Sequence, residues 1–66
     1  SNGAFIQVGS YSNENVAKQK VDNLKRNGAD AFIVKSELER GIFYRVRIGK
    51  FNSLDSAKQF AVNKLK

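Results

Sequence analysis

The feature that most constrains the fold of this chain is a stretch with a strict two-residue period, Gly41-Ile42-Phe43-Tyr44-Arg45-Val46-Arg47-Ile48-Gly49-Lys50-Phe51. Because successive side chains of a β-strand point to opposite faces, one face of this stretch is apolar and the other combines an aromatic ring with two cations. The apolar face comprises Tyr44, Val46 and Ile48, and the other face comprises Phe43, Arg45, Arg47 and Gly49. We therefore predict a central strand that packs on a core with one face and meets a ligand with the other.

The same pattern occurs earlier in the chain at an offset of 40 residues. Residues 5–11 (Phe-Ile-Gln-Val-Gly-Ser-Tyr) align with residues 45–51, and matches at the same offset continue into the segments that follow. Each copy reads as a strand, a turn with glycine and a helix. The pattern predicts one domain, residues 4–66, built from a twofold repeat over 4–35 and 43–66. We exclude residues 1–3 from the fold as a linker or an artificial extension.

Composition narrows the function classes for this chain of 66 residues. Without His or Cys, it lacks imidazole catalysis, thiol nucleophiles and the commonest metal ligands. Its six acidic residues show no paired spacing, so we expect no enzyme, no catalytic or metal-ligating residue and no cofactor. The formal net charge of +6 favours an anionic partner, although solubility alone also explains such a charge. No apolar run is long enough to insert into a membrane.

The predicted elements alternate in the order strand, helix, strand, strand, helix. We expect strands at 4–10, 29–35 and 41–51, helices at 14–26 and 54–65, and a hairpin loop at 36–41. This order is typical of an α+β fold, a ferredoxin-like or RNP-like two-layer sandwich with two helices on one face of an antiparallel sheet. A fourth strand of that fold is missing or supplied elsewhere. The first strand is then an edge open to pairing, which predicts some tendency to form a homodimer.

Periodicity also predicts which side chains face the core. In the first strand we expect Ile6 and Val8 on one face and Phe5, Gln7 and Gly9 on the other. In the second strand we favour Ala31 and Ile33 toward the core and Phe32 and Val34 on the open face; the reverse parity is the alternative. The helices are expected to bury two apolar stripes, Ala17, Val21 and Leu24 in the first and Leu54, Ala57, Ala61 and Leu65 in the second.

The face opposite the helices carries the candidate ligand-binding residues, Phe5, Gln7, Phe32, Phe43, Arg45 and Arg47. An aromatic plane can stack on a sugar ring while Gln and Arg bond its hydroxyl, amide and carboxylate groups. The alternative is that another domain or a dimer partner covers this face of the sheet, which would account for the same aromatic and polar residues. RNA binding is a weaker alternative, because only Arg40, Gly41 and Tyr44 match the RNP1 motif and Tyr44 is expected on the core side.

Three segments together resemble the SPOR domain, the sporulation-related repeat. These are Phe5-Ile6-Gln7-Val8-Gly9-Ser10-Tyr11, then Asn27-Gly28-Ala29-Asp30-Ala31-Phe32-Ile33-Val34, and the alternating stretch 41–51, with Ala57 after it. The family pattern has a strand of the type aromatic-x-Gln-x-Gly-Ser-aromatic and a later strand of the type Tyr-Arg-Val-x-x-Gly-x-Phe. The resemblance covers residues 4–65.

The resemblance implies a bacterial peptidoglycan-binding module with a ferredoxin-like fold that binds glycan on the open face of its sheet. Such domains favour glycan strands without stem peptides and gather at division septa or sites of wall remodelling in the cell envelope. The positions that the family uses match Gln7, Ser10 and Phe43, where Phe43 replaces a frequent Trp. The resemblance thus predicts glycan strands as the partner, with no nucleic acid; a protein-interaction module of the envelope is the alternative.

Overall fold

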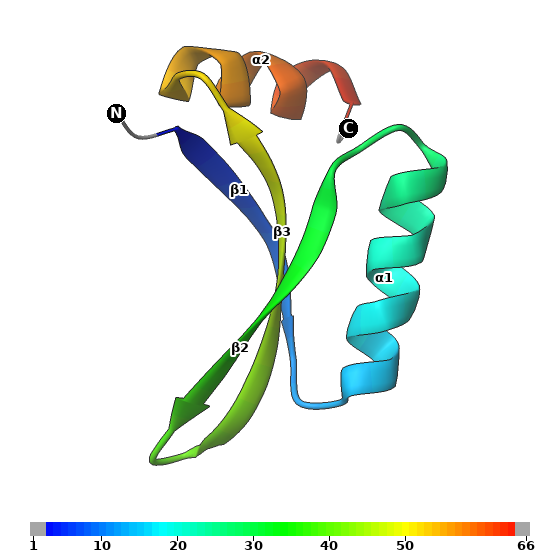
Figure 1. Cartoon of the computed structure of the whole chain (residues 1–66), viewed down its shortest axis with the longest axis vertical. Helices are drawn as coiled ribbons and strands as arrows, with labels where there is room; N and C mark the ends of the chain where they lie inside the picture. Colours follow the sequence, from blue (N-terminus) through cyan, green and yellow to red (C-terminus); the bar gives the residue numbers. More distant parts are fainter. Residues whose placement is uncertain (1–2, 65–66) are drawn as a thin grey trace.

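Strand β3 (Gly41–Phe51) is the centre of the sheet in the computed structural model, which describes residues 3–64. Within these residues the sheet has three strands in the order β1-β3-β2, where β1 is Ala4–Tyr11 and β2 is Ala31–Leu38. Both pairings are antiparallel (Figure 1). The prediction of a central strand at 41–51 is confirmed.

The two helices are α1 (Glu14–Arg26) and α2 (Leu54–Lys64). Helix α1 begins at an N-cap, where the Asn13 side-chain oxygen accepts a hydrogen bond from Val16 N at 3.2 Å. It ends at Arg26. Gly28, two residues further on, has a φ of 88° that follows the pattern of a glycine C-terminal cap, with Ala29 N donating to Leu24 O at 3.0 Å. Helix α2 is capped in the same way as α1, because Ser56 N donates to Ser53 Oγ at 3.1 Å.

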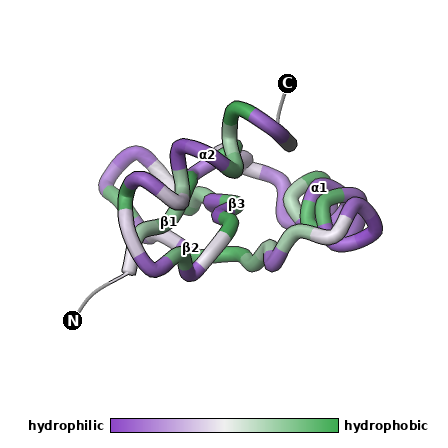
Figure 2. The backbone as a smooth tube through the Cα atoms, turned by 90° about the horizontal axis from the view of Figure 1, so that it is seen from above, coloured by the Kyte–Doolittle hydropathy of each residue, from purple (hydrophilic) through white to green (hydrophobic). Residues whose placement is uncertain are grey.

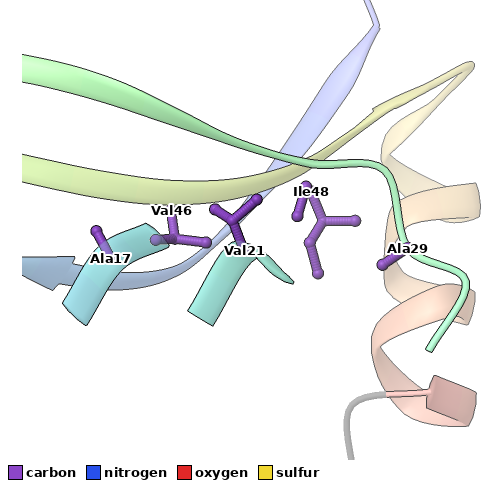
Figure 3. Packing of buried hydrophobic residues seen from close by; sticks show 6 residues of the cluster. Ala17, Val21, Ala29, Val46 and Ile48 are labelled. Atoms are coloured by element: carbon purple, nitrogen blue, oxygen red, sulfur yellow. The ribbon is translucent and has the colours of Figure 1, made fainter. Parts of the chain in front are cut away.

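Both helices pack on the sheet face that carries Val46 and Ile48, which are 0% and 1% exposed. Val21 of α1 lies beside these two residues in the core (Figure 3). Phe60 of α2 packs against the same core, and its ring centroid lies 5.3 Å from the ring centroid of Phe51. Figure 2 shows the hydrophilic side of α1 turned away from the strands. The fold is therefore α+β with a βαββα ferredoxin-like arrangement, as predicted.

The buried residues confirm the favoured parity of the second strand, because Ala31 and Ile33 belong to the core. The stripe of the second helix is partly wrong. Ala57 is buried, but Leu54 is 63% exposed because it stands at the first position of α2, before the helix reaches the sheet. Leu65 lies outside the described residues.

The hairpin between β2 and β3 is longer than predicted. Strand β2 begins at Ala31 instead of Ala29 and continues to Leu38, which pairs with Gly41. Only Glu39 and Arg40 form the turn, so the predicted loop at 36–41 is wrong. Polar residues suit a strand here because the hairpin projects beyond β1 and the helices (Figure 1), which leaves both of its faces near water. Their composition therefore resembles that of a loop.

Two bulges interrupt the pairing of β1 with β3. Gln7 pairs with Arg47 but Gly9 pairs with Val46, so β1 has one extra residue at this point. Gly9 therefore lies on the core side, which corrects its predicted place beside Phe5 and Gln7. A side chain at Gly9 would also collide with Tyr11, since a Cβ there would lie 2.6 Å from the Tyr11 ring.

Candidate functional site

The candidate site is the sheet face opposite the helices, which we call the open face. The side chains of β3 that alternate with buried Val46 and Ile48 point to this face. The register adds their cross-strand neighbours from β1 and β2. The resulting open face contains Phe5, Gln7, Ser10, Phe32, Val34, Ser36, Phe43, Arg45 and Arg47.

Arg47 lies in the middle row of the open face. It pairs with Gln7 on one side and Phe32 on the other. Its Nε donates to Gln7 Oε1 at 3.3 Å. This bond occupies the Gln7 carbonyl and leaves the Gln7 NH₂ group and the two terminal nitrogens of Arg47 directed elsewhere. The middle row can therefore donate hydrogen bonds to an acceptor that lies on the sheet.

Arg45 lies in the next row, between Ser10 and Val34. Its Nε donates to Ser36 Oγ at 3.0 Å, in a partly buried hydrogen bond. Because Nε is already bonded, the guanidinium keeps its two terminal nitrogens for a ligand, and these form a fork that fits a carboxylate. Ser36 was missed by the sequence analysis because its segment was assigned to the hairpin loop.

Ser10 reaches the open face through the bulge between Gln7 and Gly9. Plain alternation from Gln7 would place Ser10 on the core side, three residues further along the strand. The extra residue in β1 reverses the parity, so Ser10 lies opposite Arg45 and is exposed. The structure thus places together the two β1 residues, Gln7 and Ser10, that the family resemblance had assigned to the ligand.

Aromatic rings lie on both sides of the two arginines along the direction of β3. Phe5, at one end, packs edge to face on Phe32, the cross-strand neighbour of Arg47, with ring centroids 5.5 Å apart and planes at 77°. Phe5 is 49% exposed, so this pair presents apolar surface to solvent. Phe43 lies at the other end, half-buried and opposite Ser36. The open face therefore has apolar ends and a cationic centre.

Arg40, like Ser36, is a residue that the sequence analysis did not assign to the site. Its guanidinium carbon lies 5.0 Å from the centroid of the Phe43 ring, a cation–π geometry. Arg40 precedes Phe43 by three residues, and this spacing brings the two side chains together only when Glu39 and Arg40 form the turn. The sequence alone did not predict that turn. Tyr44, by contrast, packs against the core, so it cannot serve as the stacking residue of an RNP1-like motif.

A sheet with helices on one face, and with aromatic and hydrogen-bonded cationic side chains on the other, defines a ligand-binding module of the α+β class. The family model of the SPOR domain matches residues 1–66, the whole chain. The chain belongs to the SPOR domain family, which confirms the resemblance. The search of curated proteins and the search of solved structures gave no match.

Membership of this family gives the chain a general function. SPOR domains are peptidoglycan-binding modules, so this domain binds the cell wall. SPOR is a family of binding domains that occur in cell-envelope proteins, which fits a non-enzymatic role in the envelope. Neither helix of residues 3–64 combines the length and the apolar character needed to cross a membrane.

Proposed function

We propose that this domain binds peptidoglycan glycan strands that lack stem peptides, and that it binds them on the open face. The observation that supports this proposal is the pair of arginines whose Nε atoms are bonded to Gln7 and Ser36. These bonds orient two cationic forks beside the aromatic rings of the open face. A glycan strand offers apolar sugar faces for the rings and anionic groups for the forks.

The sugar contacts belong to the aromatic rings. Phe43 stacks on one pyranose ring at the hairpin end of the open face, and Phe5 with Phe32 extends the apolar floor at the other end. Gln7 and Ser10 donate to or accept from the hydroxyl and N-acetyl groups between them. Both polar residues are exposed, so a ligand reaches them without any change of the backbone.

The anionic contacts belong to Arg45 and Arg47. Removal of a stem peptide leaves a lactyl carboxylate on the sugar, and an intact stem peptide masks that carboxylate as an amide. A fork of two guanidinium nitrogens bonds a carboxylate in two places, whereas it gains only a single neutral acceptor from an amide. The same chemistry therefore gives affinity for the glycan and a preference for strands without peptides.

We infer from this preference that the domain directs a parent protein to division septa or sites of wall remodelling in the periplasm, where such strands are produced. The experiment is a pulldown with purified, protein-free sacculi, with and without amidase treatment. Wild type is compared with Gln7→Ala/Phe43→Ala and with a matched control, Gln19→Ala/Leu54→Ala, whose side chains are exposed on the helices.

Binding that increases after amidase treatment, falls in the open-face variant and persists in the control supports the proposal. Equal binding by all three proteins contradicts the assignment of the open face. Binding that decreases after amidase treatment contradicts the preference for strands without stem peptides. Circular dichroism of each variant verifies that the fold is retained.

We also propose that the domain has some tendency to form homodimers through β1. Among residues 3–64, β1 is an outer strand of the sheet, with β3 as its only strand neighbour. An outer strand presents backbone groups that can pair with a second copy. Light scattering over a concentration series tests this proposal, and a constant monomer mass contradicts it.

A further inference from the structure

The hairpin turn places a cation on the ring that we assign to sugar stacking. Arg40 is exposed, and its guanidinium carbon lies 5.0 Å from the Phe43 ring centroid. Beyond the Tyr11–Tyr44 pair, β3 is no longer paired with β1, so the hairpin end consists of β2 and β3 alone. Within the described chain, Arg40 therefore covers Phe43 from the tip of the hairpin.

A sugar ring and this guanidinium compete for the same surface. A stacked pyranose brings its atoms into van der Waals contact with an aromatic ring at about 3.5–4 Å, over the ring face that the Arg40 guanidinium covers. Stacking on the covered face of Phe43 therefore displaces Arg40. The displacement forfeits a cation–π contact, which at an exposed site corresponds to about a two- to fivefold change in affinity.

The ligand's charge decides whether this loss is recovered. A neutral sugar offers the displaced guanidinium nothing equivalent to the aromatic face. An acidic sugar offers a carboxylate, which forms charge-assisted hydrogen bonds with arginine that are about twice as strong as neutral ones. The long side chain of Arg40 and its position in the turn, three residues before Phe43, allow it to move from the ring to a substituent at the edge of the sugar.

We propose that Arg40 is a specificity-determining residue that covers Phe43 in the free domain and gives way preferentially to acidic sugars. This inference rests on the proposed function and deepens it. Arg45 and Arg47 attract carboxylates at the centre of the open face, whereas Arg40 adds discrimination against neutral sugars at the stacking position. The ligand class that follows is a glycan with a carboxylate on the sugar that stacks on Phe43.

The test compares two glycans that differ only in charge. One is a preparation of amidase-treated glycan strands. The other is the same preparation after carbodiimide coupling to ammonia, which converts each lactyl carboxylate into a neutral carboxamide. Isothermal titration measures both for wild type, Arg40→Ala and a control, Lys35→Ala. Lys35 is an exposed cation of the same hairpin, opposite Tyr44 and thus on the other face.

We expect Arg40→Ala to bind the neutral strands about two- to fivefold more tightly than wild type, without tighter binding of the acidic strands, while Lys35→Ala keeps the wild-type ratio. Equal shifts for both glycans, or no shift, overturn the inference. Phe43→Ala separates the two proposals. Weaker binding of both glycans by Phe43→Ala keeps the proposed function even if Arg40→Ala has no effect. Unchanged binding by Phe43→Ala overturns both the stacking assignment and the role of Arg40.

Discussion

At the scale of single residues, Arg45 and Arg47 are set apart from ordinary surface arginines by the use of their Nε atoms. Each Nε donates to a neighbouring side chain, Ser36 Oγ at 3.0 Å or Gln7 Oε1 at 3.3 Å. These bonds restrict a side chain that otherwise loses much rotamer freedom when a ligand binds. Ser36 and Gln7 thus preorganise the two guanidinium groups for ligand binding.

Ser36→Ala removes the hydrogen bond that orients Arg45 without changing the charge of the open face. We expect the domain to bind amidase-treated glycan strands about two- to tenfold more weakly, because a net hydrogen bond contributes about 0.5–1.5 kcal/mol. Titration calorimetry measures this change. Ser12→Ala, at the exposed turn before α1, is the control and should bind like wild type. Wild-type affinity in Ser36→Ala would show that Arg45 needs no orientation.

Gly49 supports the fold rather than the ligand contacts. Its φ is 143°, and a Cβ at this position would lie 2.9 Å from a Phe5 ring atom and 3.0 Å from Ala4 O. Gly49→Ala should therefore lower the free energy of unfolding by about 1–3 kcal/mol, as expected for a residue forced into a sparsely populated conformation. Urea denaturation measures the loss.

Gly28→Ala is the matched control for that substitution. Gly28 also has a positive φ, 88°, but a Cβ there would meet nothing within 4 Å. We expect a smaller loss, about 1 kcal/mol, from backbone conformation alone. A loss in Gly28→Ala as large as that in Gly49→Ala would mean that the contacts with Phe5 and Ala4 contribute little.

At the scale of elements, periodicity predicted the strands and helices but not the irregularities between them. The two-residue alternation of 41–51 and the asparagine and glycine at the ends of α1 have local physical causes, so they are readable from sequence. The bulge in β1 is a feature of its pairing with β3, a strand far away in the sequence, so alternation within β1 does not reveal it. Alternation alone would therefore place Ser10 on the wrong face.

The length of the hairpin was the second limit of prediction. Ser36 and Glu37 have the composition of a loop, and nothing local shows that they pair with Phe43 and Ile42. The consequence for the site was that Ser36 and Arg40 were missed. The twofold repeat remains a prediction, although its 40-residue offset maps Gln7 onto Arg47, and these two residues pair directly across β1 and β3.

Helix α1 depends on its N-cap. The Asn13 side chain satisfies Val16 N at the start of the helix. Asn13→Ala should lower the free energy of unfolding by about 0.5–2 kcal/mol, because this backbone group loses its partner. Asn13→Asp keeps an acceptor at the cap and should retain nearly wild-type stability. Thermal unfolding of both variants makes the comparison, and equal destabilisation by the two would contradict the capping role.

At the scale of the whole molecule, positive charge is spread over both the helices and the sheet, whereas the proposed site contains only some of the cations. The formal net charge is +6, and exposed lysines such as Lys25 and Lys58 lie on the helices. A general attraction between a basic domain and an anionic wall would not depend on which cations are removed. Local recognition by Arg45 and Arg47 would instead be lost only when these two cations are removed. Two variants with the same net charge separate these explanations.

Arg45→Ala/Arg47→Ala and Lys25→Ala/Lys58→Ala each lower the formal net charge from +6 to +4. We expect the arginine variant to lose most of its affinity for amidase-treated glycan strands at low salt, where screening is weakest, and to lose most of the salt dependence of binding. The lysine variant should keep both, because its charges lie on the helices. Binding measured at several salt concentrations makes the comparison. Equal weakening of the two variants would mean that net charge, rather than the arrangement of the open face, attracts the glycan.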